Sequence, residues 1–539
     1  MQWNRRLVLI GGAASFGACA SGSPASVLAP ADPLIVETAQ GRYRGAMEGG
    51  VQVFRGMRYG ASTEGRNRFR PPRPPEPWAG VRDATAFGDQ APQSSSILAA
   101  EQPMSEDCLR INIWTPAADS VRRPVLLWFH GGGFEAGASS IPLYNGAKIA
   151  RRGDVVVATI NHRLNVFGHC YLADALGEDF AQSGNTGYLD LVAAMKWVRE
   201  NIGRFGGDPN NVMIYGQSGG GRKVSLCFAG REAEGLFHKG VVQSGSHLRV
   251  QPIELANELS SELMKELGIP KGEAIRLQTV PLATLSAAQL KIMLATGTRF
   301  SPVLDGHSFT SHPYLPDAPA ISSHIPMMLG TTRTELTSQL GARPGIFDMD
   351  KPSAMAALAA FLPAEDIREA FDVFQASRPE ASPSEVFFTI ASARGYVRDQ
   401  TIMAENRIAA SGSAPTYVYR LMWRSPVEGG RRVSQHSLDL PFIFDTVDTV
   451  PHITGPETEE TRAMVDQMAE TWLAFAKTGD PNHAGIPAWA PYDLETRPTM
   501  MFDLPPTVQQ DPHAAERSFM ARYETQQVGE TAIHRRRAN

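Results

Sequence analysis

The stretch from Val212 to Gly221 constrains the fold of this 539-residue chain more than any other part of it. An apolar run ends at Gly216, Ser218 follows between glycines, and residues 223–229 predict the start of a helix. A G-x-S-x-G sequence between a strand and a helix is typical of a nucleophile elbow, where a sharp turn lifts a serine hydroxyl off the end of a sheet. Gly216 and Gly220 remove the side chains that would collide in such a turn.

The elbow motif is not decisive by itself. At ordinary composition, G-x-S-x-G occurs by chance in roughly one chain in four of this length. The run Gly219 to Gly221 before a helix is also typical of a loop that binds phosphate. No Walker lysine spacing and no G-x-G-x-x-G with a downstream ribose-binding acid supports a nucleotide site. The choice between these interpretations depends on the rest of the chain.

Apolar runs and helical periodicities alternate along most of the sequence. Continuous apolar runs predict strands that are covered on both faces, and apolar residues three or four apart predict helices. The predicted strands are 109–114, 125–129, 155–160, 212–215, 240–243, 325–329 ending at Gly330, and 416–421, and the clearest helices are 190–202, 256–267 and 461–477. The alternation predicts an α/β fold with a large, mostly parallel twisted sheet and helices on both faces. Residues 252–320 and 340–412 are predicted to be helical inserts.

The domain prediction divides the chain into a leader, a linker, one large domain and a tail. The predicted segments are an export signal at 1–20, a linker at 21–33, a single domain at 34–525 and a flexible basic tail at 526–539. Residues 7–18 are apolar but too few to span a membrane as a stable helix. Small residues at 18–20 then offer a cleavage site. We therefore expect an exported protein, periplasmic or extracellular.

Two features leave the export route open. The paired arginines at 5 and 6 are typical of the twin-arginine route, and residues 16–19 resemble a lipobox in which Cys19 becomes a lipid anchor. A plain Sec signal cleaved after Ala20 is the alternative.

Charge and cysteine content exclude some partners. With 51 basic and 56 acidic residues, the net charge of −5 gives no general attraction to nucleic acid. The chain has four cysteines, and none of them has C-x-x-C or metal-ligand spacing: Cys19, Cys108, Cys170 and Cys227. We expect buried free thiols, with one disulfide among the last three as the open alternative.

A serine nucleophile also needs an imidazole base, an acid that orients it and donors for the oxyanion. The donors are predicted at residues 130–134, His-Gly-Gly-Gly-Phe, directly after the predicted strand 125–129. Consecutive glycines let several N–H groups point into one space. A glycine-rich turn without a role is the alternative for this motif alone. The combination of an H-G-G-G motif with a downstream elbow is a more specific sign of a serine nucleophile site than either motif alone.

With these motifs the chain resembles the type-B carboxylesterase family of α/β-hydrolases, which includes cholinesterases and bacterial esterases. The resemblance extends from about residue 35 to about 503 and implies the α/β-hydrolase fold, with helical inserts over the active site. The matching blocks, in family order, are 105–109, 124–137, 153–168, 184–185, 205–212, 243–246 and 475–482.

The resemblance implies a role for each catalytic residue. Ser218 would be the nucleophile, Glu335 the acid and His436 the base, in the chain order of α/β-hydrolases. Asp439 is the reserve acid. Further residues implied are the oxyanion donors Gly132, Gly133 and Gly219, Ser244 as a hydrogen-bond partner of the acid, and Gln217 beside the nucleophile.

The activity implied is hydrolysis of neutral, small or medium carboxylic esters by water through an acyl-enzyme. No cofactor and no metal is implied, and the chain would be a monomer or homodimer. A lipase, or a hydrolase of polymer or toxin esters, is an alternative within the fold. A catalytically inactive interaction protein is a distant alternative, because such relatives usually lose the serine or histidine that this chain keeps.

The sequence departs from many family members at the elbow, where Gln217 replaces a glutamate and Gly219 an alanine. A carboxylate about 6 Å from a cation contributes at most about 3 kcal/mol at an effective dielectric of about 20. Because Gln217 lacks this charge, we predict no preference for choline-like cationic esters. Hydrolysis of acetylthiocholine and of a neutral thioester of similar size should show comparable kcat/KM, and a strong preference for the cation would contradict the prediction.

Overall fold

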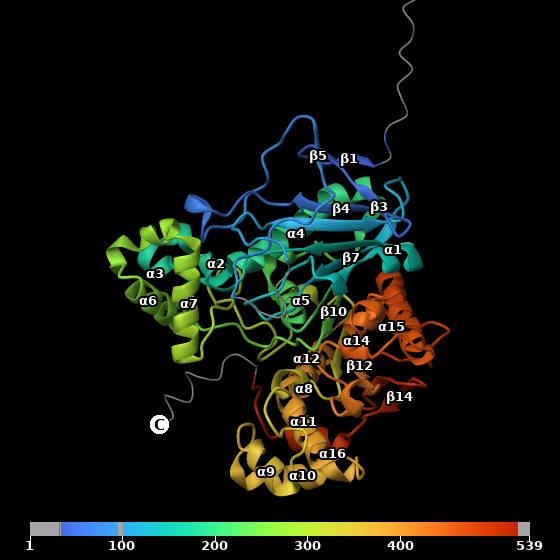
Figure 1. The fold of residues 1–539 in the computed structure, drawn as a ribbon. Helices are drawn as coiled ribbons and strands as arrows, with labels where there is room; N and C mark the ends of the chain where they lie inside the picture. The colour runs from blue at the N-terminus through green and yellow to red at the C-terminus, as the bar shows by residue number, and fades with distance from the viewer. Residues whose placement is uncertain (1–31, 33, 95–100, 411, 527–539) are drawn as a thin grey trace, which may run out of the picture. The chain divides into compact units, whose positions relative to one another are not determined.

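The structure is a computed structural model that describes residue 32 and residues 34–94, 101–410 and 412–526. The described residues from Leu34 onward form one compact unit. The predicted export signal, with Cys19, and nearly all of the linker and of the basic tail lie outside the described residues. Figure 1 shows the order of the elements along the chain.

The strands form one large sheet and one small sheet. They are β1 (Ile35–Glu37), β2 (Arg42–Arg44), β3 (Ala46–Glu48), β4 (Val51–Arg58), β5 (Val81–Asp83), β6 (Arg110–Thr115), β7 (Arg123–Phe129), β8 (Val156–Ile160), β9 (Gly207–Gln217), β10 (Lys239–Gln243), β11 (Met327–Thr332), β12 (Thr416–Leu421), β13 (Pro498–Phe502) and β14 (Thr507–Gln510). The large sheet has the order β14-β13-β12-β11-β10-β9-β7-β8-β6-β4-β3, and β1, β2 and β5 form the small one.

The centre of the large sheet is parallel and its edges are antiparallel. The strands from β8 through β7, β9, β10, β11 and β12 to β13 pair in parallel. At the edges, β14 pairs antiparallel with β13, and β6, β4 and β3 continue antiparallel from β8. The predicted α/β fold with a mostly parallel sheet is confirmed.

The order of strands reverses at β7, which lies between β8 and β9. Phe129, the last residue of β7, pairs with Gly216 near the end of β9. Loops that follow adjacent parallel strands at such a switch point meet at one edge of the sheet, where ligands of open α/β folds bind. The glycine loop at 130–134 and Ser218 therefore leave the sheet side by side.

Helices cover both faces of the sheet, as predicted. They are α1 (Ala147–Gly153), α2 (Asn165–His169), α3 (Ala173–Leu176), α4 (Thr186–Asn201), α5 (Gly219–Ala229), α6 (Ile253–Glu266), α7 (Leu282–Thr296), α8 (Leu336–Leu340), α9 (Lys351–Leu358), α10 (Ile367–Ala376), α11 (Pro383–Ser392), α12 (Arg398–Ala409), α13 (Leu440–Ile443), α14 (Pro451–Thr454), α15 (Glu459–Thr478) and α16 (Ala514–Met520). None of the helices in the described ranges is long and apolar enough to cross a membrane.

The large sheet has a hydrophobic core on each face, and alternate side chains of β7 belong to one core or the other. Val125, Leu127 and Phe129 belong to the core that α4 and α5 cover, whereas Leu126 and Trp128 belong to the core that α15 covers. All five side chains are at most 1% exposed. A strand buried on both faces explains the unbroken apolar run in the sequence.

Two helical groups lie beyond the sheet and have small cores of their own. Helices α6 and α7 lie beside α2 and α3, and α9, α10, α11 and α16 pack together (Figure 1). Leu259, Leu263 and Ile292 belong to the first of these cores, and Phe371 and Phe387 to the second. Helices α6 and α7 lie in the predicted insert 252–320, and α9, α10 and α11 lie in the predicted insert 340–412, whereas α2, α3 and α16 lie outside both.

The boundaries of several elements differ from the predicted ones. Strand β11 does not end at Gly330 but continues to Thr332, so that prediction was wrong. A β-carbon on Gly330 would lie 1.8 Å from the Tyr419 ring, so the glycine serves close packing and not a turn. Strands β13 and β14 were not predicted, because each is short and lacks a long apolar run.

The cysteines in the described residues are free. Cys108, Cys170 and Cys227 are buried and form no disulfide. Burial raises the pKa of each thiol, to about 12 for Cys170. The prediction of buried free thiols is confirmed for these three residues.

Candidate active site

Ser218 occupies a strained turn between β9 and α5. Its backbone angles are φ 58° and ψ −122°, a region that non-glycine residues rarely adopt. A β-carbon at Gly216 would lie 2.4 Å from the carbonyl carbon of Gly220, and one at Gly220 would lie 2.0 Å from the Phe129 oxygen. The structure therefore has the strand–turn–helix geometry that the motif predicts.

The glycine loop that follows β7 lies directly against this turn. A β-carbon on Gly131 would be 3.6 Å from Cβ of Ser218, and one on Gly219 would be 2.3 Å from the nitrogen of Gly133. Gly132 and Gly133 have φ values of 89° and 64°. Within the described residues, the N–H groups of Gly132, Gly133 and Gly219 donate no hydrogen bond. The three predicted oxyanion donors are thus close together and available to a ligand.

Buried neutral groups hold the glycine loop. The His130 ring stacks on His162 at 4.8 Å with an interplanar angle of 10°, and Lys223 Nζ donates a 2.9 Å hydrogen bond to the His130 carbonyl. Burial lowers the pKa of both imidazoles well below the ordinary value, so both are neutral. Burial also lowers the pKa of Lys223. The loop therefore rests on a buried, closely packed base.

The predicted acid and base are in contact. Nδ1 of His436 lies 2.5 Å from Oε2 of Glu335, which is completely buried. The other carboxylate oxygen of Glu335 accepts a 2.7 Å hydrogen bond from the backbone N–H of Thr332. The loops that carry the two residues are joined by an isolated bridge between Thr334 and Gln435.

Asp439, the reserve acid, faces elsewhere. It accepts hydrogen bonds from Gln243 Nε2 at 2.7 Å and from the Tyr419 hydroxyl at 3.3 Å. Burial raises the pKa of Asp439 to about 6. Glu335 is therefore the carboxylate in contact with His436.

The structure does not join the serine to the imidazole. Nε2 of His436 lies 3.1 Å from Nε2 of Gln217, and Oε1 of Gln217 accepts a 3.1 Å hydrogen bond from the Ser437 hydroxyl. No hydrogen bond of the Ser218 hydroxyl is present within the described residues. The Gln217 amide thus donates to Nε2 of His436. In the predicted mechanism, this is the nitrogen that takes the proton from Ser218.

The hydrogen bond expected between Ser244 and the acid is absent. The Ser244 hydroxyl is buried without a hydrogen-bond partner in the described part of the chain, while its backbone N–H donates to the Gly330 carbonyl at 2.7 Å. Ser244 has φ 47°, so its backbone turns at the end of β10. The residue shapes the turn beside the elbow rather than binding Glu335.

Tyr396 is a site residue that the sequence did not indicate. Its ring lies 5.3 Å from the His436 ring, and its hydroxyl accepts a 2.5 Å hydrogen bond from Gln339. It lies in a π-helical turn, Ala393–Val397, between α11 and α12. Such turns are frequent at functional sites, but nothing in the local sequence predicts one.

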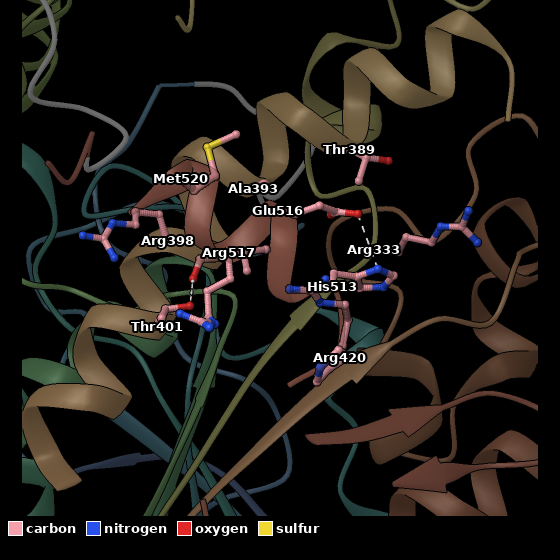
Figure 2. Close-up of a pocket in the computed structure, with 12 residues that line it drawn as sticks. Arg333, Thr389, Ala393, Arg398, Thr401, Arg420, His513, Glu516, Arg517 and Met520 are labelled. Carbon is pink, nitrogen blue, oxygen red and sulfur yellow. Dashed lines mark hydrogen bonds and ion pairs between the residues drawn. The ribbon is translucent and has the colours of Figure 1, made fainter. Parts of the chain in front are cut away.

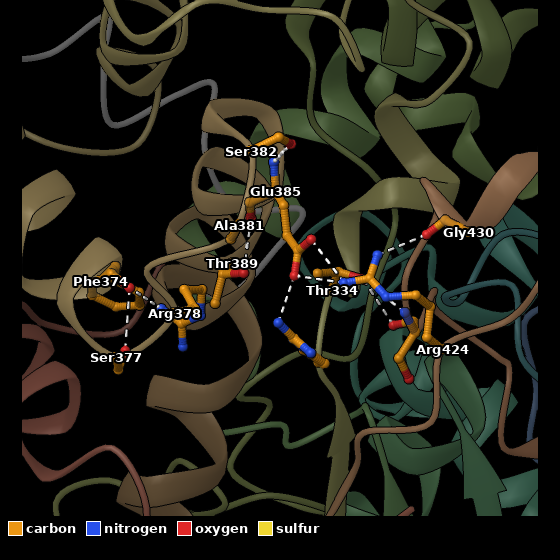
Figure 3. A network of polar contacts seen from close by, with 12 residues as sticks. Thr334, Phe374, Ser377, Arg378, Ala381, Ser382, Glu385, Thr389, Arg424 and Gly430 are labelled. Atoms are coloured by element: carbon orange, nitrogen blue, oxygen red, sulfur yellow. Dashed lines mark hydrogen bonds and ion pairs between the residues drawn. The ribbon is translucent and has the colours of Figure 1, made fainter.

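A polar network holds the segment that carries the acid. Glu385 on α11 binds Arg333, two residues before Glu335, and also Arg424 at 2.8 Å. Figure 3 shows Glu385 directed at Arg424, which donates in turn to the Gly430 carbonyl. The helical insert is thereby tied to the end of β11.

The described residues contain no group of three or more His, Cys, Asp or Glu side chains arranged to hold a metal ion. The arrangement offers a strained serine, an imidazole in contact with a carboxylate, and free backbone donors. Fold and site together define an α/β-hydrolase.

Comparisons with known proteins identify the family. The sequence profile of the Carboxylesterase family matches residues 32–520. Para-nitrobenzyl esterase of Bacillus subtilis (strain 168) is 35% identical over 493 residues, which are 90% of this chain and 97% of that protein. The chain therefore belongs to the carboxylesterase family, and it is a carboxylic ester hydrolase.

Solved structures of esterases have the same fold. A carboxylesterase of Geobacillus stearothermophilus has a TM-score of 0.79 and 37% identity, over 90% of this chain and 100% of that one. An esterase of Clostridium hathewayi is described as able to hydrolyse aliphatic aromatic polyesters. It has a TM-score of 0.77 and 33% identity, over 90% of this chain and 98% of that one.

In this chain the glycine loop approaches Gly219 so closely that the alanine of many family members does not fit after the serine. The added methyl in Gly219→Ala would lie 2.2 Å from the Gly133 oxygen, so the loop must move and its donors with it. We expect kcat on a p-nitrophenyl ester to fall by about 10² to 10³, as when one oxyanion donor is lost. Gly203→Ala, where a β-carbon meets nothing within 4 Å, is the control. Unchanged kcat in Gly219→Ala would contradict the assignment.

Proposed function

We propose that this carboxylic ester hydrolase works through a triad of Ser218, His436 and Glu335 and forms an acyl-enzyme on Ser218. The observation that carries the proposal is the contact between Glu335 and His436 beside a strained serine turn. The carboxylate orients the imidazole by accepting its Nδ1–H, which leaves Nε2 without a proton and able to act as a base once Gln217 is displaced. The free amides of the adjacent glycine loop support an oxyanion site.

In the proposed reaction, the Ser218 oxygen attacks the ester carbonyl carbon while its proton moves to Nε2 of His436. The carbonyl oxygen becomes an oxyanion bound by the N–H groups of Gly132, Gly133 and Gly219. The imidazolium then gives its proton to the departing alcohol, and Glu335 stabilises the cation. Water, with His436 again as base, releases the acid and restores the serine.

Gln217 gives the resting site a feature of its own. Because Nε2 of His436 accepts from the Gln217 amide, the serine hydroxyl must replace this donor before attack. We propose that the imidazole changes its partner from Gln217 to Ser218 when an ester binds. In the resting state, the amide would keep the imidazole in the tautomer that has its proton on Nδ1.

The proposed substrates are neutral, small or medium carboxylic esters. The name of the para-nitrobenzyl esterase supports this class. A polymer ester is a second candidate, because the Clostridium relative is described as hydrolysing polyesters. A series of p-nitrophenyl esters of increasing chain length, assayed beside a polyester film, separates the two.

We also propose that the enzyme acts after export, in the periplasm or outside the cell, either anchored through a lipid on Cys19 or free after cleavage following Ala20. The paired arginines, the apolar run at 7–18 and the lipobox-like residues support this proposal.

Replacing the nucleophile tests the triad. We expect Ser218→Ala to lower kcat by roughly 10⁶, because the hydroxyl acts as a unit with its base. An organophosphate should label Ser218 of the wild type at one site by mass spectrometry and leave Ser218→Ala unlabelled. An unchanged melting temperature is the control for folding. Residual activity within tenfold of the wild type would remove Ser218 from its role.

Replacing the neighbouring amide tests the exchange of partners. In Gln217→Glu a carboxylate faces the imidazole and favours the imidazolium, which cannot take the serine proton. The inactive protonated form then persists to higher pH, so the acidic limb of the kcat/KM profile should move upward by about one pH unit, or about 1.4 kcal/mol. Gln509→Glu, on the exposed strand β14, is the control. If the acidic limb of the profile does not move, the contact between residue 217 and His436 is contradicted.

A further inference from the structure

A narrow cleft whose lining contains none of the triad residues is rich in arginine. Figure 2 shows it between β12, α12 and α16. Its polar lining includes Arg333, Arg398, Arg420, His513, Glu516 and Arg517. The lining thus carries four arginines and one glutamate, and Figure 2 shows the Arg333 and Arg398 side chains directed away from Glu516.

The carboxylates near the cleft are already engaged. Glu516 binds Arg378 at 2.7 Å, and Arg517 binds Asp511 through two hydrogen bonds of 2.7 Å. Arg333 binds Glu385, which also holds Arg424 (Figure 3). These pairs leave two arginines of the lining without a carboxylate.

Arg398 and Arg420 are those two arginines. Nε of Arg398 donates to the Tyr523 carbonyl at 3.1 Å, and Arg398 makes no salt bridge in the described ranges. The Arg420 guanidinium makes neither a hydrogen bond nor a salt bridge to any described residue, although the side chain is partly buried. Burial lowers the pKa of Arg420, and Arg378 and Arg333 act in the same direction, whereas the carboxylates of Glu516 and Glu335 oppose the shift. A partly buried guanidinium without a partner leaves strong directional donors unused.

His513 adds a neutral polar group to the cleft. Burial, and then Arg420, Arg378 and Arg333, lower the pKa of His513 to about 3, so the ring is uncharged near neutral pH. Its backbone and that of Asp511 have φ values of 62° and 41°, so two residues of this turn are held in left-handed conformation. Such strain is concentrated at ligand sites.

We propose that this cleft is a binding site for a small oxyanion, a phosphate or a carboxylate, which the Arg420 guanidinium holds, with Arg398 contributing only its more distant positive charge. Guanidinium groups bind both anions through paired N–H donors, and the Arg420 guanidinium has no hydrogen-bond partner among the described residues. None of the lining residues belongs to the triad. A ligand here would lie next to the segment 333–335, which carries Glu335. Arg333 lines the cleft, and its backbone N–H donates to the Leu421 carbonyl at 3.0 Å.

Calorimetric titration of the full chain with inorganic phosphate, and separately with acetate, tests the site and identifies the preferred anion. We expect saturable binding at one site and a higher melting temperature with the bound anion. Arg420→Gln should weaken binding at least tenfold, and Arg398→Gln should weaken it less. Arg122→Gln, which removes one exposed arginine that pairs with Asp208, is the matched control and should bind as the wild type does.

Two outcomes of the titrations, and a third from blocking Ser218, would overturn the proposal. One is the absence of saturable binding of either anion, and the other is equal binding by Arg420→Gln, Arg398→Gln and the wild type. The comparison with Arg398→Gln keeps the test valid if Arg420→Gln fails to fold. Binding must also persist after an organophosphate has blocked Ser218, because loss at that step would assign the anion to the catalytic pocket.

Discussion

The parallel pairing of β7 with β9 is the constraint on which the rest of this site depends. It places the loop after Phe129 and the turn at Ser218 at one edge of the sheet, with glycine backbones in direct contact. Side chains at Gly216, Gly219 or Gly220 would push these segments apart. The strained serine conformation persists because a buried sheet and the helix α5 hold both of its ends.

The second requirement is a carboxylate that can remain buried. Glu335 is completely removed from solvent, which is costly for a charge unless hydrogen bonds compensate it. The Thr332 amide and the His436 ring supply those bonds, and the bridge between Thr334 and Gln435 keeps the two loops together. The neighbouring Asp439 binds other residues, so Glu335 alone of these two acids contacts the imidazole.

Strong local patterns explain which parts of the fold could be predicted. The parallel strands were found because burial on both faces produces unbroken apolar runs, and the elbow because its turn demands glycine. The boundary at Gly330 was wrong because glycine marks close packing as well as turns. Tyr396 and the Gln217 contact with His436 could not be predicted, because both depend on segments far apart in the chain.

The sequence by itself determined the α/β architecture, the elbow at Ser218, the glycine loop and, through its resemblance to carboxylesterases, the choice of Glu335 and His436. These features are local or carried by motifs, so their physical causes lie within a few residues. Only the tertiary structure decided that the Gln217 amide contacts the imidazole, that Ser244 does not bind the acid, and that the Arg420 guanidinium has no hydrogen-bond partner among the described residues. Such outcomes depend on which side chains meet in space, and the spacing of residues along a chain does not specify that.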